Sequence, residues 1–246
     1  MAMLIPIRDL NPHKRFPIVT LALIGTCALA YIATASNLLQ LSPLASFRWG
    51  AVPCDVVGQC PAFSGQLEQE FPSRSPYLSV LSSMFMHGDI LHLGFNMLFL
   101  WVFGNNVEDH LGRIRFAIFY LVTGFAAAFA HIAVSADSQI PIVGASGAIS
   151  GILGGYALLW PRATIISILP LGFFFTTIRT PAWVSLGLWF VVQLFGGVAG
   201  LGEASGGGVA YLAHVGGFVA GLALIFPFGA GRPRPGREPV LDEWRE

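Results

Sequence analysis

The sequence predicts an all-α, polytopic membrane protein, and the observations behind this are its composition and the spacing of its charges. Hydrophobic residues make up 54% of the chain and charged residues 11%, with a mean hydropathy of +0.69. A soluble domain carries about a quarter charged residues. The few charges are clustered, so several apolar runs approach the ~20 residues that a helix needs to cross a bilayer. The net charge is zero, which gives no reason to expect nucleic-acid binding.

Six apolar runs are predicted to be membrane-spanning helices. Asp89 can cap the second at its N-terminus, and Gly104-Asn105-Asn106 is expected to end it, because these residues tolerate left-handed backbone geometry. The segment 165–177 is apolar but short and contains a proline and a glycine, so we expect it to be interfacial or re-entrant. The predicted spans are residues 16–35, 90–103, 115–134, 145–160, 181–198 and 209–226.

These spans predict a single membrane domain, residues 16–228, with short extensions at both ends. Residues 1–15 form a charged N-terminal segment. Residues 229–246 are polar and proline-rich, which predicts a disordered tail. Between the first two spans, residues 36–89 are predicted to form a long irregular loop.

The distribution of basic residues predicts the orientation of these spans. Eleven of the thirteen Lys and Arg residues fall on the side that also holds both termini, and only Arg48 and Arg74 lie in the loop 36–89. Basic residues concentrate on the cytoplasmic side of membrane proteins. We therefore expect a plasma (inner) membrane protein with both termini in the cytoplasm and this loop outside. There, Cys54 and Cys60 are candidates for a disulfide, and two free thiols are an equally open alternative.

Two of the predicted spans carry rows of small residues spaced four apart. This spacing places each row on one helix face. Small faces let two membrane helices approach to backbone contact, so the fourth and sixth spans are expected to pack closely. The rows are Gly147, Gly151 and Gly155 in the fourth span, and Ala213, Gly217 and Gly221 in the sixth.

Four polar residues within the spans are expected to lie at a similar depth below the outer surface. Polar groups inside a membrane are costly and are therefore candidate functional groups. Ser146 needs a base to act as a nucleophile, and His214 can accept its proton. The backbone N–H of Ser146 and the side chains of His92 and Asn96 can serve as donors to an oxyanion. No Asp or Glu lies in a position to orient His214, so the sequence predicts a dyad without metal or cofactor.

Other interpretations stay open at this point. Each polar residue alone is more often a structural hydrogen-bonding group between or within helices. Ser150 is a rival nucleophile one turn deeper, and His87, His92 and His214 are a candidate metal site that lacks carboxylate or thiolate support. A transporter with a polar site at mid-membrane is a further alternative, but we find no inverted repeat.

Four short motifs occur together along the chain. They are His87-x4-His92-x3-Asn96, Gly104-Asn105-Asn106-Val107-Glu108-Asp109, Gly144-Ala145-Ser146-Gly147 and Ala213-His214-x2-Gly217-x3-Gly221. Over about residues 47–221 the chain resembles the rhomboid intramembrane serine proteases. Two features differ from many members: Pro76-Tyr77-Leu78-Ser79 stands where a Trp-Arg pair precedes the second span, and Ser150 stands where some members have a tyrosine that stacks on the base.

The resemblance implies a six-helix rhomboid-like bundle that hydrolyses peptide bonds in transmembrane substrates. It implies Ser146 as nucleophile, His214 as base and an oxyanion site that includes His92 and Asn96. Substrates would be membrane proteins embedded in the same bilayer, with helix-weakening residues near its outer face. A non-catalytic relative that binds membrane proteins is the alternative function.

Overall fold

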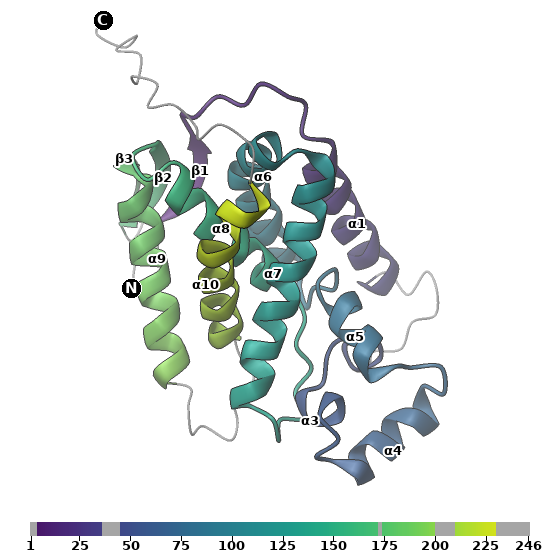
Figure 1. Cartoon of the computed structure of the whole chain (residues 1–246). Coiled ribbons are helices and arrows are strands. Elements are labelled where there is room, and N and C mark those ends of the chain that lie inside the picture. Colours follow the sequence, from purple (N-terminus) through teal and green to yellow (C-terminus); the bar gives the residue numbers. More distant parts are fainter. Residues whose placement is uncertain (1–3, 36–44, 172–173, 200–209, 230–246) are drawn as a thin grey trace, which may run out of the picture.

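The structure is a computed structural model, and it describes residues 4–35, 45–171, 174–199 and 210–229. Six long apolar helices form the body of the molecule (Figure 1). They are α1 (Ile18–Ala35), α6 (Ile90–Leu111), α7 (Arg113–Val134), α8 (Ser146–Leu159), α9 (Ala182–Ala199) and α10 (Tyr211–Phe228). The predicted disordered tail lies outside the described residues, apart from Gly229.

Four of these helices, α6, α7, α9 and α10, are long and apolar enough to cross a membrane. The apolar helices α1 and α8 are shorter. The protein is therefore a helical membrane protein, as predicted, while the count of six spans stays a prediction. In the described part of the chain α8 lies among the other helices, and most of its residues are buried.

The second predicted span ends later than expected. We predicted a stop at residue 103, but α6 continues through Gly104-Asn105-Asn106 and ends at Leu111, where it is followed by Gly112 with a positive φ of 76°. The continuation brings the Glu108 carboxylate to the start of α1, where it accepts hydrogen bonds from the backbone N–H groups of Val19 (3.0 Å) and Thr20 (2.8 Å). A carboxylate at a helix N-terminus satisfies donors that have no partner within the helix, so this last part of α6 fixes α1.

The all-α fold class that the sequence predicted is not met, because the segment 165–177, expected to be interfacial or re-entrant, contributes to a sheet. Strands β1 (Ile5–Asp9), β2 (Thr164–Leu171) and β3 (Phe174–Pro181) make a three-stranded antiparallel sheet in the order β1-β2-β3. Its β-branched residues favour extended structure, and Ile5 pairs with Ile168. The sheet lies at one end of the helices (Figure 1). In the sequence, β2 and β3 connect α8 to α9, and β1 precedes α1.

Asp9, at the end of β1, joins this sheet to the helices. Its Oδ2 accepts hydrogen bonds from the hydroxyl of Tyr156 and from Nδ2 of Asn106, both at 2.7 Å. Burial raises the pKa of Asp9 from 3.8 to about 6, and the Tyr156 hydrogen bond opposes this only in part. The native protein therefore holds a proton on Asp9 over a pH range in which the unfolded chain has lost it.

We expect Asp9 to make the protein less stable as the pH rises from about 4 to about 6. The native state binds the Asp9 proton more tightly than the unfolded chain does. The stability that this proton contributes is therefore complete below pH 3.8 and is lost as the pH rises past 6. The loss is up to about 3 kcal/mol. Unfolding in detergent at pH 4, 5, 6 and 7 measures it, with Asp9→Asn as the comparison. A difference between the two proteins that does not change with pH would contradict this assignment.

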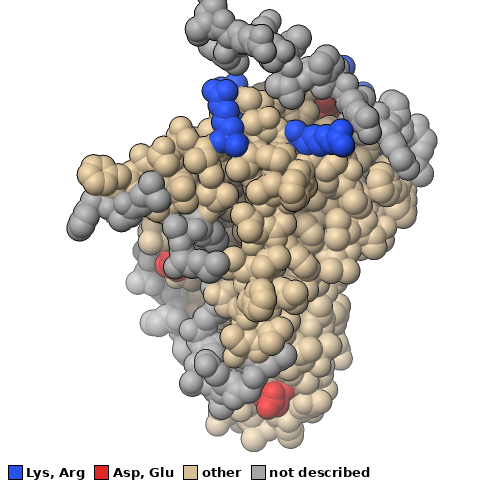
Figure 2. Space-filling model, turned by 90° about the vertical axis from the view of Figure 1, so that its left-hand side faces the viewer, with Lys and Arg blue, Asp and Glu red and all other residues tan. Residues whose placement is uncertain are grey.

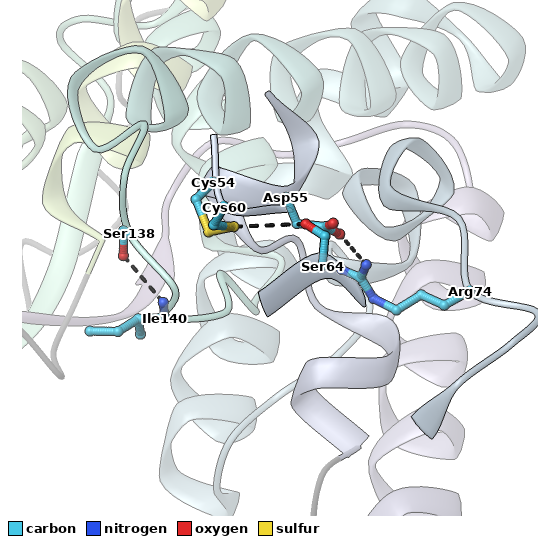
Figure 3. The surroundings of a disulfide bond; sticks show 7 residues. All are labelled: Cys54, Asp55, Cys60, Ser64, Arg74, Ser138 and Ile140. Carbon is cyan, nitrogen blue, oxygen red and sulfur yellow. Dashed lines mark hydrogen bonds and ion pairs between the residues drawn. A yellow bond between two sulfur atoms is a disulfide. The ribbon is translucent and has the colours of Figure 1, made fainter. Parts of the chain in front are cut away.

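The described part of the first loop, residues 45–89, is largely helical rather than irregular. It contains α2 (Ala45–Trp49), α3 (Pro53–Val56), α4 (Pro61–Glu70) and α5 (Pro76–Ser83), and it lies at the opposite end of the molecule from the sheet (Figure 1). Cys54 and Cys60 form a disulfide in it (Figure 3). Of the two alternatives that the sequence left open, a disulfide and two free thiols, the structure has the disulfide.

Arg74 contacts several segments of this loop, in which the Trp-Arg pair of many rhomboid-like sequences is absent. Its guanidinium forms an ion pair with Asp55, and both side chains are at most 5% exposed (Figure 3). Arg74 also donates to the backbone carbonyls of Phe47 (2.9 Å) and Gly50 (3.4 Å). One buried cation therefore joins α2, α3 and the segment before α5.

Candidate active site

The site begins with the close packing of α8 and α10. A Cβ on Gly221 would lie 1.9 Å from the carbonyl oxygen of Gly151, and one on Gly217 would lie 2.1 Å from that of Gly147. No side chain fits at such distances, so the two backbones are in direct contact. The predicted packing of the two small-residue faces is confirmed, and it determines which side chains meet at the end of α8.

Ser146 and His214 lie side by side at this contact. Ser146 is the first residue of α8 and is partly exposed, while His214 lies in the first turns of α10 and is 8% exposed. Oγ of Ser146 is 2.7 Å from Nε2 of His214. This is hydrogen-bonding distance, and it is the arrangement that a serine nucleophile and its base require.

His92 lies next to Ser146, across Gly144. The backbone of Gly144 has a φ of +126° and its N–H donates to the carbonyl of Ser83 at 2.9 Å. A Cβ there would lie 2.8 Å from Nε2 of His92 and 3.4 Å from Oγ of Ser146. Both groups therefore border the same small space. The N-cap Asp89 accepts from the backbone N–H of His92 at 2.8 Å, which holds the start of α6 in place.

Asn96 lies one turn along α6 from His92 and is buried. Its Nδ2 donates to the carbonyl of His92 at 3.0 Å. A side-chain amide has two N–H donors, so one of them is used within α6. The predicted oxyanion donors thus come from two elements, the side chains from α6 and the Ser146 backbone from α8.

The other candidate residues from the sequence, Ser150 and His87, make structural contacts. Ser150 is fully buried and its hydroxyl donates to the carbonyl of Ser146 at 2.6 Å, the common intrahelical use of serine. His87 packs its ring edge-on to His92, with ring centroids 5.2 Å apart. Burial, and then the nearby His92, lowers the pKa of His87 to about 4, so its ring is neutral at pH 7. Within the described ranges no three His, Cys, Asp or Glu residues form a group that could hold a metal ion.

Two residues that sequence reasoning missed surround His214. Oε1 of Gln193 is 2.7 Å from Nδ1 of His214, and the ring of Trp189 lies 5.9 Å from the imidazole. Both come from α9. Trp189 thus places an aromatic ring beside the base, which is the role that the resemblance gives to a tyrosine at the position of Ser150. The signal for Gln193 was present in the sequence, because a glutamine inside an apolar span is costly and marks a function or a polar contact.

A cavity of about 650 Å³ lies elsewhere, at the corner between α6 and α7. Its lining includes Arg15, Asp109, Arg113 and Arg115, but neither Ser146 nor His214. Because α7 leads away from this corner to the end at which α8 begins, the cavity belongs to the opposite end of the helices. The candidate site therefore depends on its hydrogen-bond geometry and not on this cavity.

Comparison with known proteins agrees with this arrangement of motifs. The sequence profile of the rhomboid domain matches residues 74–231, more than half of the chain. The chain belongs to the rhomboid family. It is 32% identical over 149 residues to the mitochondrial Rhomboid protein 1 of Saccharomyces cerevisiae, a match that covers 59% of this chain and 40% of the yeast protein.

Two bacterial members of the rhomboid family have names that state an activity. The chain is 32% identical over 168 residues to Rhomboid protease GluP of Bacillus subtilis, which covers 66% of this chain and 29% of GluP. It is 30% identical over 156 residues to Rhomboid protease GlpG of Serratia proteamaculans, which covers 62% of this chain and 49% of GlpG. The chain thus spans less than half the length of the rhomboid relatives named here. The family includes proteases, and its relatives also include mitochondrial proteins.

Proposed function

We propose that the protein is an intramembrane serine endopeptidase that cleaves transmembrane segments of membrane proteins. The observation that carries the proposal is the 2.7 Å contact between Oγ of Ser146 and Nε2 of His214. It occurs where α8 and α10 meet in a member of a family with named proteases. The alternative, a non-catalytic binding or quality-control factor, has no use for a hydrogen-bonded nucleophile and base.

In the proposed reaction, Oγ of Ser146 attacks the carbonyl carbon of the scissile peptide and Nε2 of His214 takes the hydroxyl proton. The resulting oxyanion accepts hydrogen bonds from the backbone N–H of Ser146 and from the side chains of His92 and Asn96. His214 then gives its proton to the leaving amine, which releases one product and leaves an acyl-enzyme. A water molecule, deprotonated by His214, hydrolyses this ester and restores Ser146.

We further propose a plasma (inner) membrane location, with the site open to the outer side and both termini in the cytoplasm. On the face that Figure 2 shows, the Lys and Arg side chains gather near the end that carries the sheet. The helices α3 and α4, which the disulfide connects, lie toward the other end (Figure 1), and Gly144, two residues before Ser146, donates its N–H to the carbonyl of Ser83 at the end of α5. Disulfides persist in oxidising compartments, so both observations support this orientation.

Cleavage of a model transmembrane substrate in liposomes tests the proposal. We expect Ser146→Ala and His214→Ala each to lower the cleavage rate by at least about 10³-fold, because each removes a partner of one catalytic unit. A fluorophosphonate probe should label the wild type at Ser146 and not label Ser146→Ala. Unfolding temperatures in detergent control for folding. Cleavage retained by folded Ser146→Ala, or labelling at Ser150, would refute the assignment.

A further inference from the structure

We propose that Gln193 is a positioning residue that holds His214 in the tautomer required of the base, and that the position of α9 thereby sets the activity of the site. The inference rests on the proposed function. The polar contacts of His214 come from both sides of its ring, Ser146 on α8 at Nε2 and Gln193 on α9 at Nδ1, each at 2.7 Å. The imidazole is thus held between two helices.

The chemistry of the two contacts determines where the proton lies. An amide oxygen only accepts hydrogen bonds, and a neutral imidazole carries its one N–H on either Nδ1 or Nε2. With Oε1 of Gln193 facing Nδ1, the proton belongs on Nδ1. The lone pair of Nε2 is then directed at Oγ of Ser146, as proton acceptance requires.

Burial makes this preference strong. Gln193 is 5% exposed and His214 is 8% exposed. A buried N–H without an acceptor costs the full desolvation of that group, so the loss of Oε1 would favour the other tautomer. In that tautomer Nε2 donates toward Ser146 and cannot take its proton. Gln193 therefore has the orienting part of the role that a buried Asp has in a serine-protease triad, without its negative charge.

The contact also couples the base to α9. Gln193 and Trp189 are four residues apart and lie on one face of α9, and Trp189 packs on His214 and on Phe218 of α10. Much of the rest of α9 is exposed on the surface of the protein, with Trp183 61% and Phe195 71% exposed. A displacement of α9 from α10 would remove the Nδ1 acceptor, so the base is fully oriented only while α9 lies against α10.

Two variants and a control test the role of Gln193. We expect Gln193→Leu to lower kcat about ten- to a hundredfold with little change in KM, because a buried hydrogen bond and the tautomer preference are lost. Gln193→Glu keeps an acceptor and should retain more activity. The acidic limb of its pH–rate profile should shift to higher pH than in the wild type, because a carboxylate beside the imidazole favours its protonated form. The control Leu194→Ala changes a neighbouring residue that is 40% exposed and should behave as wild type.

Imidazole ¹⁵N resonances give a readout that is independent of cleavage. The chain has six histidines, and the His214 signals are those absent from His214→Ala. We expect the proton on Nδ1 in the wild type and a shift toward Nε2 in Gln193→Leu. A wild-type proton on Nε2, or a Gln193→Leu protein with unchanged kcat and pH profile, would overturn the role of Gln193. An inactive wild type would instead overturn the proposed function, and the resonances would still test the Gln193 contact.

Discussion

Gly221→Ala is expected to destabilise the protein by about 3 kcal/mol or more and to abolish cleavage. The new Cβ would lie 1.9 Å from the carbonyl oxygen of Gly151 and 2.8 Å from its Cα, so backbone meets side chain and no rotamer change relieves the overlap. Overpacking of a close-packed interior costs typically 1–3 kcal/mol and sometimes more. The two helices must separate, which moves His214 on α10 away from Ser146 on α8. A displacement of about 1 Å can cost 10²-fold in rate.

Gly187→Ala is the matched control for this substitution. Gly187 lies within α9, and a Cβ there meets no atom within 4 Å. Alanine is the better helix former by about 1 kcal/mol, so this variant should be as stable as wild type or more stable. Unfolding temperature and substrate cleavage, measured in the same detergent, check both variants. Equal stability of the two would mean that the contact between α8 and α10 is not as tight as described.

The positions of these glycines explain why much of the site was predictable. Rows with a four-residue period are a local property of the sequence, and two such rows at a similar depth predict a helix contact in any membrane bundle. The serine and the histidine at the head of these rows then follow by geometry. Their juxtaposition was predicted from the small-residue rows together with their similar depth in the membrane, and the structure places the two atoms 2.7 Å apart.

What could not be predicted depends on contacts between distant segments. The strands β2 and β3 were missed because a short apolar run with Pro170 has no clear period, and its partner β1 lies at the far end of the sequence. The continuation of α6 past Gly104 depends on Glu108 reaching α1. Gln193 was visible as a polar residue, but only the rotation of α9 shows that it faces His214.

Asp55→Asn is expected to destabilise the first loop by about 3–5 kcal/mol. The substitution keeps the size of the side chain but leaves the buried guanidinium of Arg74 without a counter-charge, and removal of one partner from a buried ion pair costs this much. The backbone carbonyls of Phe47 and Gly50 would still accept from Arg74, but neutral acceptors do not balance a buried cation. Thermal unfolding in detergent and proteolysis of the loop, with the Cys54–Cys60 disulfide intact, measure the effect.

Two comparisons isolate the ion pair from a general change in charge. Glu70→Gln removes one negative charge at an exposed position of α4, and surface substitutions of this kind change stability by about 0.5 kcal/mol or less. The double variant Asp55→Leu with Arg74→Met removes both charges together, and apolar replacement of a buried pair is often neutral. We therefore expect it to recover most of the stability that Asp55→Asn loses. If Asp55→Asn and Glu70→Gln lowered the unfolding temperature equally, Arg74 would not be the residue that holds this loop together.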